Sequence, residues 1–231
     1  MKKMLVFLVA LMLVMVSVTA YGAGRIRVTQ ENYHLIESYG KYGYAFAKVE
    51  NVGDKPIKVN AGILEVFDGE GDAITSTDYL SSYAEYLQPN EYTYVSLRAE
   101  IEDAEMIPDD YMLTITGKSD NSYFSRRLPV ETDYQEDVKT RYGTTNYMYA
   151  TVTNDTEELV YDITVLLVLL DKDGNILYMD SSSLYSDKAL MPGSAVMIRL
   201  EPRSSFEEYF AKEGLVPASV DAVAYVNVRQ D

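Results

Sequence analysis

Apolar and polar residues alternate along much of the chain, a pattern typical of β-strands with one buried face. In the segment 44–50, Ala45, Ala47 and Val49 occupy every second position. We therefore expect these three side chains to face a core, and Tyr44 and Phe46 to face outward. Further strands are predicted at 64–68, 92–97, 111–116, 167–171, 195–200 and 222–228.

An internal repeat relates the two halves of the sequence. A displacement of 103 residues needs no gap and aligns Tyr44, Ala47, Val49, Asn51, Asp68, Gly71, Leu87, Pro89 and Leu97 with Tyr147, Ala150, Val152, Asn154, Asp171, Gly174, Leu190, Pro192 and Leu200. Apolar positions between these identities keep the same phase. Such self-similarity indicates a duplicated structural unit. We expect a signal segment at 1–22, a first module at 23–127 and a second module at 128–231.

The turns between the predicted strands suggest the fold class. Hairpins are expected at 68–72 and 171–175, where Asp and Gly favour tight turns, and proline-marked turns precede 92–97 and 195–200. Short strands at this spacing predict an all-β protein of two tandem antiparallel immunoglobulin-like β-sandwiches, with a small barrel as the competing architecture.

Each module is expected to end with a short helical connection and a last strand. In the second module, Ser205 and Glu208 match a capping box at the start of a helix. Phe206, Tyr209 and Phe210 would form its apolar face, and Gly214 would end it.

The turn and core residues resemble those of FxLYD-type domains of bacterial envelope proteins. The matching elements are Val49-Glu50-Asn51, Val66-Phe67-Asp68 with Gly71, and Pro89-Asn90-Glu91, with Val152-Thr153-Asn154, Leu169-Leu170-Asp171 with Gly174, and Pro192-Gly193-Ser194 in the second copy. Phe67 and Leu170 stand where the family has tyrosine. The resemblance implies non-enzymatic extracytoplasmic modules and supplies no catalytic residues.

The N-terminus and the net charge indicate where the protein is located and which partners are excluded. Lys2 and Lys3 precede an apolar run that ends in small residues near Ala20, the order of a secretory signal peptide, so we expect an extracellular or cell-envelope location. An uncleaved membrane anchor is the alternative for this segment. The formal net charge of −16 argues against nucleic acid as a partner. Cysteine is absent from the sequence, so the modules have no disulfide framework.

The candidate binding residues are aromatic. Alternation places Tyr42, Tyr44 and Phe46 on the outer face of one strand, and Tyr92 and Tyr94 on the outer face of its expected neighbour. Such a patch could bind a sugar ring or a protein, so an envelope component or a protein is the expected partner. Cross-strand stabilisation of the sheet, or burial against the other module, is the alternative.

Other chemistry receives less support from the sequence. The only histidine, His34, is interpreted as a surface or edge-strand residue, because no nucleophile signature accompanies it. The segment 171–175 has the alternating carboxylates of a calcium loop but lacks its downstream glutamate, so we interpret it as a hairpin. Neither a metal nor a cofactor is expected.

The leading hypothesis is a non-enzymatic binding protein. The alternatives are a structural spacer or assembly subunit and, with less support, a hydrolase using a carboxylate pair such as Glu102-Asp103, Asp109-Asp110 or Glu207-Glu208.

Overall fold

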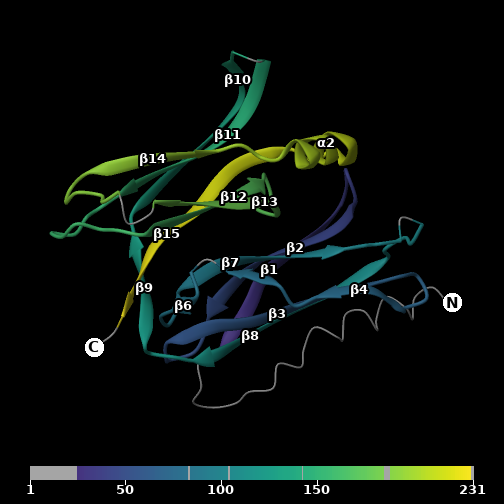
Figure 1. The fold of residues 1–231 in the computed structure, drawn as a ribbon, viewed down its shortest axis with the longest axis horizontal. Coiled ribbons are helices and arrows are strands. Elements are labelled where there is room, and N and C mark those ends of the chain that lie inside the picture. The colour runs from purple at the N-terminus through teal and green to yellow at the C-terminus, as the bar shows by residue number, and fades with distance from the viewer. Residues whose placement is uncertain (1–24, 83, 104, 142, 185–187, 230–231) are drawn as a thin grey trace.

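Strands dominate the fold, as the alternation predicts. The computed structural model describes residues 25–82, 84–103, 105–141, 143–184 and 188–229 (Figure 1). Its elements are β1 (Ile26–Glu37), β2 (Lys41–Asn51), β3 (Ile57–Phe67), β4 (Ala73–Thr77), β5 (Leu80–Ser82), β6 (Tyr86–Leu87), β7 (Tyr92–Glu100), β8 (Asp110–Ser119), β9 (Tyr123–Leu128), β10 (Val130–Thr140), β11 (Gly143–Thr153), β12 (Ile163–Asp171), β13 (Ile176–Leu184), β14 (Ala195–Leu200), α2 (Ser204–Glu213) and β15 (Pro217–Arg229). The predicted signal segment 1–22 lies outside the described residues. Within those residues, no helix has the length and apolar character needed to cross a bilayer.

The first sandwich consists of two antiparallel sheets. One has the order β1-β2-β7-β5, and the other contains β4-β3-β6 with β8 also paired to β3. This matches the A-B-E-D and C′-C-F strands of an immunoglobulin-like sandwich. Ala45, Ala47 and Val49 are buried between the sheets, as are Val95 and Leu97 from β7. The predicted sandwich, rather than the barrel, is therefore confirmed.

The second sandwich repeats this plan with differences at the edges of its sheets. Its sheets are β10-β11-β14 and β13-β12-β15-β9. The strand β9 precedes β10 in the chain, yet it pairs with β15 along 123–128. The predicted module boundary between residues 127 and 128 falls inside the end of this strand. Hydrogen bonding thus assigns residues 123–127, just before that boundary, to a sheet of the second sandwich.

The repeat is visible at equivalent asparagines. Asn51 and Asn154 are fully buried. The Asn51 amide donates to the carbonyl oxygens of Lys55 (2.8 Å) and Leu87 (3.0 Å), and its oxygen accepts from the amide of Gly53 (3.0 Å). Asn154 makes the equivalent bonds at 2.8, 2.9 and 3.0 Å. Each side chain therefore joins the end of β2 or β11 to the turn that follows it and to the segment that precedes β7 or β14.

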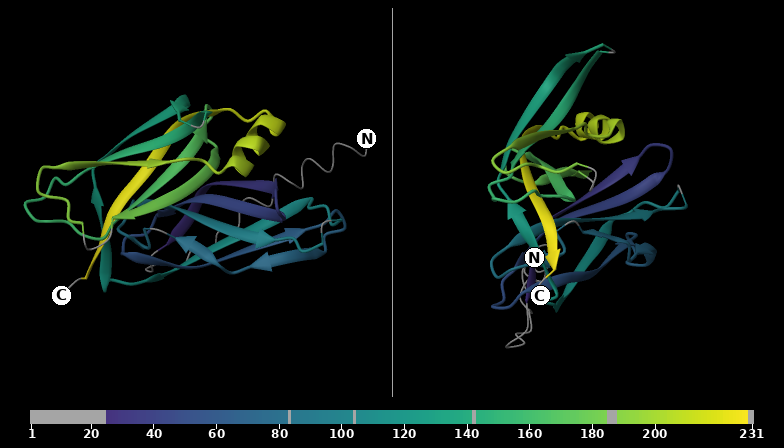
Figure 2. Two further views of the ribbon diagram at one scale, coloured as in Figure 1. Left: turned by 45° about the horizontal axis from the view of Figure 1, so that its top comes forward. Right: turned by 60° about the vertical axis from the view of Figure 1, so that its left-hand side comes forward.

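The two sandwiches pack face to face, which gives the molecule four β-layers (Figures 1 and 2). The outer face of β1-β2-β7-β5 lies against β13-β12-β15-β9. In β12, four consecutive residues, Leu166 to Leu169, are fully buried. A strand covered on both faces needs such a continuous apolar run. One hydrophobic cluster accordingly includes residues of both sandwiches, among them Phe46, Tyr94, Leu166 and Phe206.

The helical predictions need two corrections. The helix α2 begins at Ser204 with Arg203 as N-cap, and no side chain caps it, so the predicted capping box of Ser205 and Glu208 is wrong. The Arg203 carbonyl instead accepts from the amides of Phe206 (2.9 Å) and Glu207 (3.2 Å). Gly214 ends the helix in the left-handed conformation, as predicted, at φ 67°.

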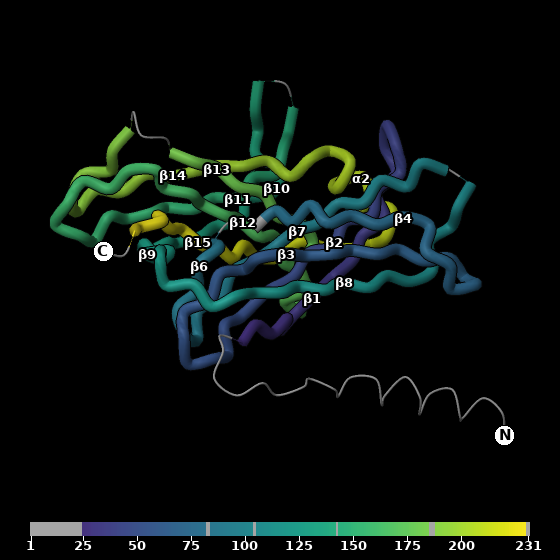
Figure 3. The backbone as a smooth tube through the Cα atoms, turned by 60° about the horizontal axis from the view of Figure 1, so that its bottom comes forward, coloured from purple at the N-terminus to yellow at the C-terminus, as the bar shows by residue number. Residues whose placement is uncertain are grey.

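The first copy departs from the prediction of a helical connection. Residues 101–103 and 105–109 contain no helix. Pro108 lies in this segment and lacks the amide that a helix needs. In the second copy, α2 can bury Phe206 and Phe210, whereas no matching aromatic residue occurs in 101–109. Figure 3 shows how the β1–β2 hairpin of the first sandwich reaches α2.

Candidate functional site

The five aromatic residues predicted as a binding face share one outer surface of the sheet, as the alternation indicates. Strand β2 carries Tyr42, Tyr44 and Phe46, and the neighbouring β7 carries Tyr92 and Tyr94. The second sandwich covers much of this surface. Phe46 is 2% exposed and Tyr94 1% exposed, whereas the other three are half-buried. The patch is therefore not an open face, and for Phe46 and Tyr94 the structure agrees with the alternative interpretation, burial against the other module.

The β7 tyrosines bind the second sandwich through one carboxylate. The hydroxyls of Tyr94 and Tyr92 donate to Asp221 Oδ2 at 2.6 and 3.3 Å. Burial raises the pKa of both phenols, and the adjacent Asp221 carboxylate raises each pKa further. Both hydroxyls therefore stay protonated and act as donors across the interface.

An aromatic cluster joins the other end of the patch to α2. The ring of Phe206 lies 4.9 Å from that of Tyr44, 6.0 Å from that of Phe46 and 4.9 Å from that of Tyr178. Phe206 is almost completely buried. Tilted and edge-to-face rings at these distances stabilise each other beyond their buried area. The start of α2 is thus fixed against the first sandwich.

Polar side chains of β1 dock on the hairpin that joins β12 to β13. Gln30 donates to the Gly174 carbonyl, and Asn32 donates to the Ile176 carbonyl at 2.8 Å. His34 Nε2 lies 3.0 Å from the same Ile176 oxygen, which fixes Nε2 as the protonated nitrogen. The segment 171–175 therefore serves as part of the interface.

His34 itself requires a correction. It lies on an edge strand, as predicted, but it is only 3% exposed rather than on the surface. The rings of Phe46, Phe206 and Tyr209 surround it at 5.5–6.5 Å. Burial among these rings lowers the pKa of His34, although its bond to the Ile176 carbonyl opposes this effect. The imidazole is neutral at pH 7.

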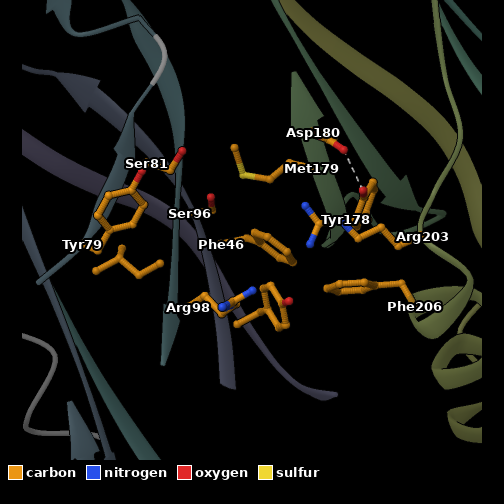
Figure 4. A pocket seen from close by; sticks show the side chains of 12 residues that line it. Phe46, Tyr79, Ser81, Ser96, Arg98, Tyr178, Met179, Asp180, Arg203 and Phe206 are labelled. Atoms are coloured by element: carbon orange, nitrogen blue, oxygen red, sulfur yellow. Dashed lines mark hydrogen bonds between the residues drawn. The ribbon is translucent and has the colours of Figure 1, made fainter. Parts of the chain in front are cut away.

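Next to these contacts the two sandwiches leave a pocket of about 470 Å³. This volume falls within the roughly 300–1,000 Å³ of small-molecule sites. The first sandwich contributes β2, β5 and β7, and the second contributes β13 and the start of α2 (Figure 4). The lining residues are Tyr44, Phe46, Tyr79, Ser81, Ser96, Leu97, Arg98, Tyr178, Met179, Asp180, Arg203 and Phe206. Two residues of the predicted patch, Tyr44 and Phe46, therefore help to line a cavity.

The charged groups of this pocket are two arginines and one aspartate. Asp180 accepts from the Tyr178 hydroxyl at 2.9 Å and from the Ser181 amide at 2.8 Å. Arg98 is stacked over the Tyr42 ring, with its Cζ 4.6 Å from the ring centroid. In the part of the chain that the structure describes, neither Arg98 nor Arg203 forms a salt bridge. The pocket can thus receive a ligand that brings both apolar surface and negative charge.

Tyr92 lies in a separate depression of about 260 Å³ beside β9 and β15. Arg127 from β9 donates there to the Tyr92 carbonyl. Tyr42 lines neither of these two cavities. Of the five predicted residues, two therefore line the ligand-sized pocket (Tyr44 and Phe46), two contact the second sandwich through Asp221 (Tyr92 and Tyr94), and Tyr42 packs beside Arg98 and Tyr44 of its own sheet.

The remaining candidates from the sequence are the calcium-like segment 171–175 and the carboxylate pairs. Asp171 Oδ1 accepts from the amides of Asp173 and Asn175, both at 2.8 Å, which makes 171–175 the predicted hairpin turn. Among the described residues, no group of three metal-ligating side chains could hold an ion. Among the carboxylate pairs, Glu207 is half-buried and its pKa is raised by burial, while Asn146 donates to it at 2.9 Å.

Sequence reasoning did not identify Arg98, Tyr178, Asp180 or Arg203 as site residues. One signal could have located the surface that they share. The second copy has an uninterrupted apolar run at 165–170, whereas the first copy has Glu65 at the matching place. Such a run indicates a strand with both faces covered, and thus a partner for the outer face of the second copy.

Neither a family model nor a curated protein matches the sequence. Among solved structures, the chain is similar to red sea bream transglutaminase at 11% identity and a TM-score of 0.23, over 88% of this chain. The chain spans about a third of that protein's length, since the match covers 31% of it.

Proposed function

We propose that this chain is a non-enzymatic binding protein of the cell envelope or extracellular space, and that its ligand binds in the pocket between the two sandwiches. The observation that carries the proposal is the composition of that pocket. Aromatic rings from both sandwiches meet there beside Arg98 and Arg203, neither of which forms a salt bridge in the part of the chain that the structure describes. Largely apolar cavities with a few convergent polar groups are typical ligand sites.

The signal-like N-terminus, in which Lys2 and Lys3 precede the apolar run, supports the proposed location. The resemblance to FxLYD-type envelope modules supports the same setting. Firm packing of the sandwiches also favours binding, because a pocket whose two walls are already fixed loses little conformational entropy when a ligand enters.

A pull-down of purified cell-wall and membrane fractions tests the proposal. The unmodified chain should capture a component, and the double variant Tyr44→Ala plus Arg203→Gln should lose that capture. The matched control is Tyr161→Ala plus Arg199→Gln, which removes an exposed tyrosine and an exposed arginine of the second sandwich outside the pocket. Loss of capture in the pocket variant alone supports the proposal. No capture by the unmodified chain, or equal capture by all three proteins, overturns it.

A second candidate function is a rigid structural spacer or assembly subunit. The specific observation in its favour is the burial of Phe46 and Tyr94 between the sandwiches. Under this proposal the aromatic patch exists to join the modules, and substitution of the half-buried Tyr44 would lower stability without changing any binding. The pull-down separates the two candidates, since only the first predicts a ligand that the pocket variant loses.

A further inference from the structure

The sheet β10-β11-β14 of the second sandwich has two edge strands, β10 and β14. An unpaired sheet edge presents a row of free amide and carbonyl groups to other strands. Proteins commonly protect such an edge with charged side chains, prolines or bulges, because it can otherwise pair with another chain. The two edges of this sheet differ in how far they are protected.

The β10 edge carries both charge and a bulge. Glu131 and Asp133 are exposed acidic residues along it. Its pairing with β11 is interrupted by a register shift between Gln135 and Val138, where Asp137 has φ 52°. The bulge bends the strand and the acidic side chains repel an acidic partner, so this edge disfavours pairing with a further strand.

The β14 edge lacks this protection. The six residues of this strand, Ala195–Leu200, include neither a proline nor an acidic side chain, and their pairing with β11 has no register shift. Ala195 and Met197 are exposed, and Met197 retains 63% of its exposure. A regular and largely apolar edge strand of this kind is a template for another strand.

The backbone of β14 shows which groups face its free edge. The Ser194 carbonyl accepts from the Asn154 amide at 2.9 Å and so points toward β11. In an antiparallel pair, successive residues direct their amides and carbonyls to opposite edges. Those of Ala195 and Met197 therefore point away from β11. Within the described residues, no strand pairs with them.

The first sandwich shows that this position of the fold takes a strand. The internal repeat aligns β14 with β7, which lies between β2 and β5 and pairs with β5 along 80–82. Ser183 and Leu184 match Leu80 and Ser81 in the repeat, but they continue β13 and pair with β12 instead. Among the described residues, β14 therefore lacks the neighbour that β7 has.

We propose that the β14 edge is the contact surface of a homodimer, in which β14 of a second copy pairs with it antiparallel about a two-fold axis. A register centred on Met197 places this residue opposite Met197 of the partner subunit. The paired residues are then those whose amides and carbonyls face the edge. This register also keeps the exposed side chains of both copies on one face of the joined sheet.

Closure of the sheet favours a second copy over an unrelated strand. The joined sheet has the order β10-β11-β14-β14-β11-β10, so both of its ends are protected β10 strands and the assembly stops at two copies. Charge agrees with this contact. Each copy has a net charge of −16 and is repelled by another copy at most of its surface. The single charged residue of β14, Arg199, is basic and stacks on Tyr147 of its own sheet at 4.3 Å.

Sedimentation velocity across a dilution series of the purified chain tests the proposal. The unmodified chain should form a reversible dimer. Met197→Lys should weaken the association by about tenfold, because it places two like charges directly opposite each other in the joined sheet. Gln135→Lys is the matched control, since it adds the same charge to the same face of the sheet at the opposite edge. It should dimerise like the unmodified chain.

A cysteine substitution tests the register. The sequence has no cysteine, so Met197→Cys introduces a unique thiol. Residues of a hydrogen-bonded pair directly opposite each other have Cα atoms about 5.5 Å apart, a separation that a disulfide can span. Mild oxidation should therefore convert Met197→Cys into a covalent dimer on a denaturing gel. Gln135→Cys, at the other edge, should run as a single chain.

Three results would overturn the proposal. The first is a monomer at every concentration, and the second is a dimer that Met197→Lys leaves unchanged or that Gln135→Lys weakens equally. The third is equal cross-linking of the two cysteine variants. Thermal unfolding of Met197→Lys should match that of the unmodified chain, because Met197 is exposed, and this shows that lost association is not lost folding. The proposed binding function is tested separately, since β14 does not line the pocket.

Discussion

Replacement of Tyr94 by Phe removes a hydroxyl that joins the two sandwiches while leaving the buried ring in place. This hydroxyl donates to Asp221 Oδ2 at 2.6 Å, and Tyr94 is 1% exposed. A hydrogen bond to a charged group contributes about 1.5–3 kcal/mol to stability. Asp221 would keep its bonds to the Tyr92 hydroxyl and to the Ala222 amide. We therefore expect a loss near the lower end of that range, about 1.5 kcal/mol.

A double-mutant cycle identifies the interaction itself. Urea unfolding of Tyr94→Phe, Asp221→Asn and the double variant should give a coupling energy of about 1 kcal/mol, because the two groups contact each other. Tyr149→Phe is the control on β11, where no hydrogen bond of its hydroxyl is seen among the described residues, and its effect should stay within about 0.5 kcal/mol. Additive effects of the Tyr94 and Asp221 substitutions, within about 0.3–0.5 kcal/mol, would show that the sandwiches are not joined at this point.

Four further predictions concern the core and the interface. Burial lowers the pKa of His34 below its unfolded value of 6.5, so the unfolded chain binds more protons than the folded chain below that pH. The free energy of unfolding should therefore fall as the pH is lowered from 6.5 toward the folded pKa. Urea unfolding should show a smaller loss in His34→Gln. Gly43→Ala should destabilise the protein by about 1–3 kcal/mol, because its new Cβ would lie 2.4 Å from the Tyr33 hydroxyl oxygen. Tyr33→Phe alone should not destabilise the protein in thermal unfolding, since that buried hydroxyl has no hydrogen-bond partner in the described structure, and a clear loss of stability would show a partner. Asn51→Ala and Asn154→Ala should each cost about 1–3 kcal/mol in the same assay, because equivalent buried carbonyls lose their donors, and a loss at only one site would contradict the structural repeat.

Local features of the fold could be predicted from the sequence because they depend on neighbouring residues. Alternation identified the buried faces of β2 and β7, and Asp171 with Gly174 identified a hairpin. The start of α2 was placed two residues too late, because Ser205 has the composition of an N-cap whereas the observed N-cap is Arg203. Composition alone does not tell which of two nearby residues leaves the helical conformation.

The arrangement of the sandwiches could not be predicted in the same way. Alternation showed that Phe46 points away from its own core, but an outward aromatic side chain can meet solvent or another surface. Whether Phe46 meets solvent or another surface depends on the apolar run in β12, about 120 residues later in the chain. The pocket arises from this long-range contact, since Arg98 and Arg203 are brought together only when the two sandwiches pack.

Hydrogen exchange followed by mass spectrometry locates the ligand site on the intact chain without any substitution. The protein is compared alone and with the envelope fraction that it captures. Backbone amides of β5, β7 and β13, and those at the start of α2, should exchange more slowly with the fraction present, because these segments form the pocket walls. The outer end of the β10–β11 hairpin, where residues 135–141 and 143–145 are mostly exposed, serves as an internal reference and should not change. Protection confined to that hairpin, or absent from the pocket walls, would contradict a binding site between the sandwiches.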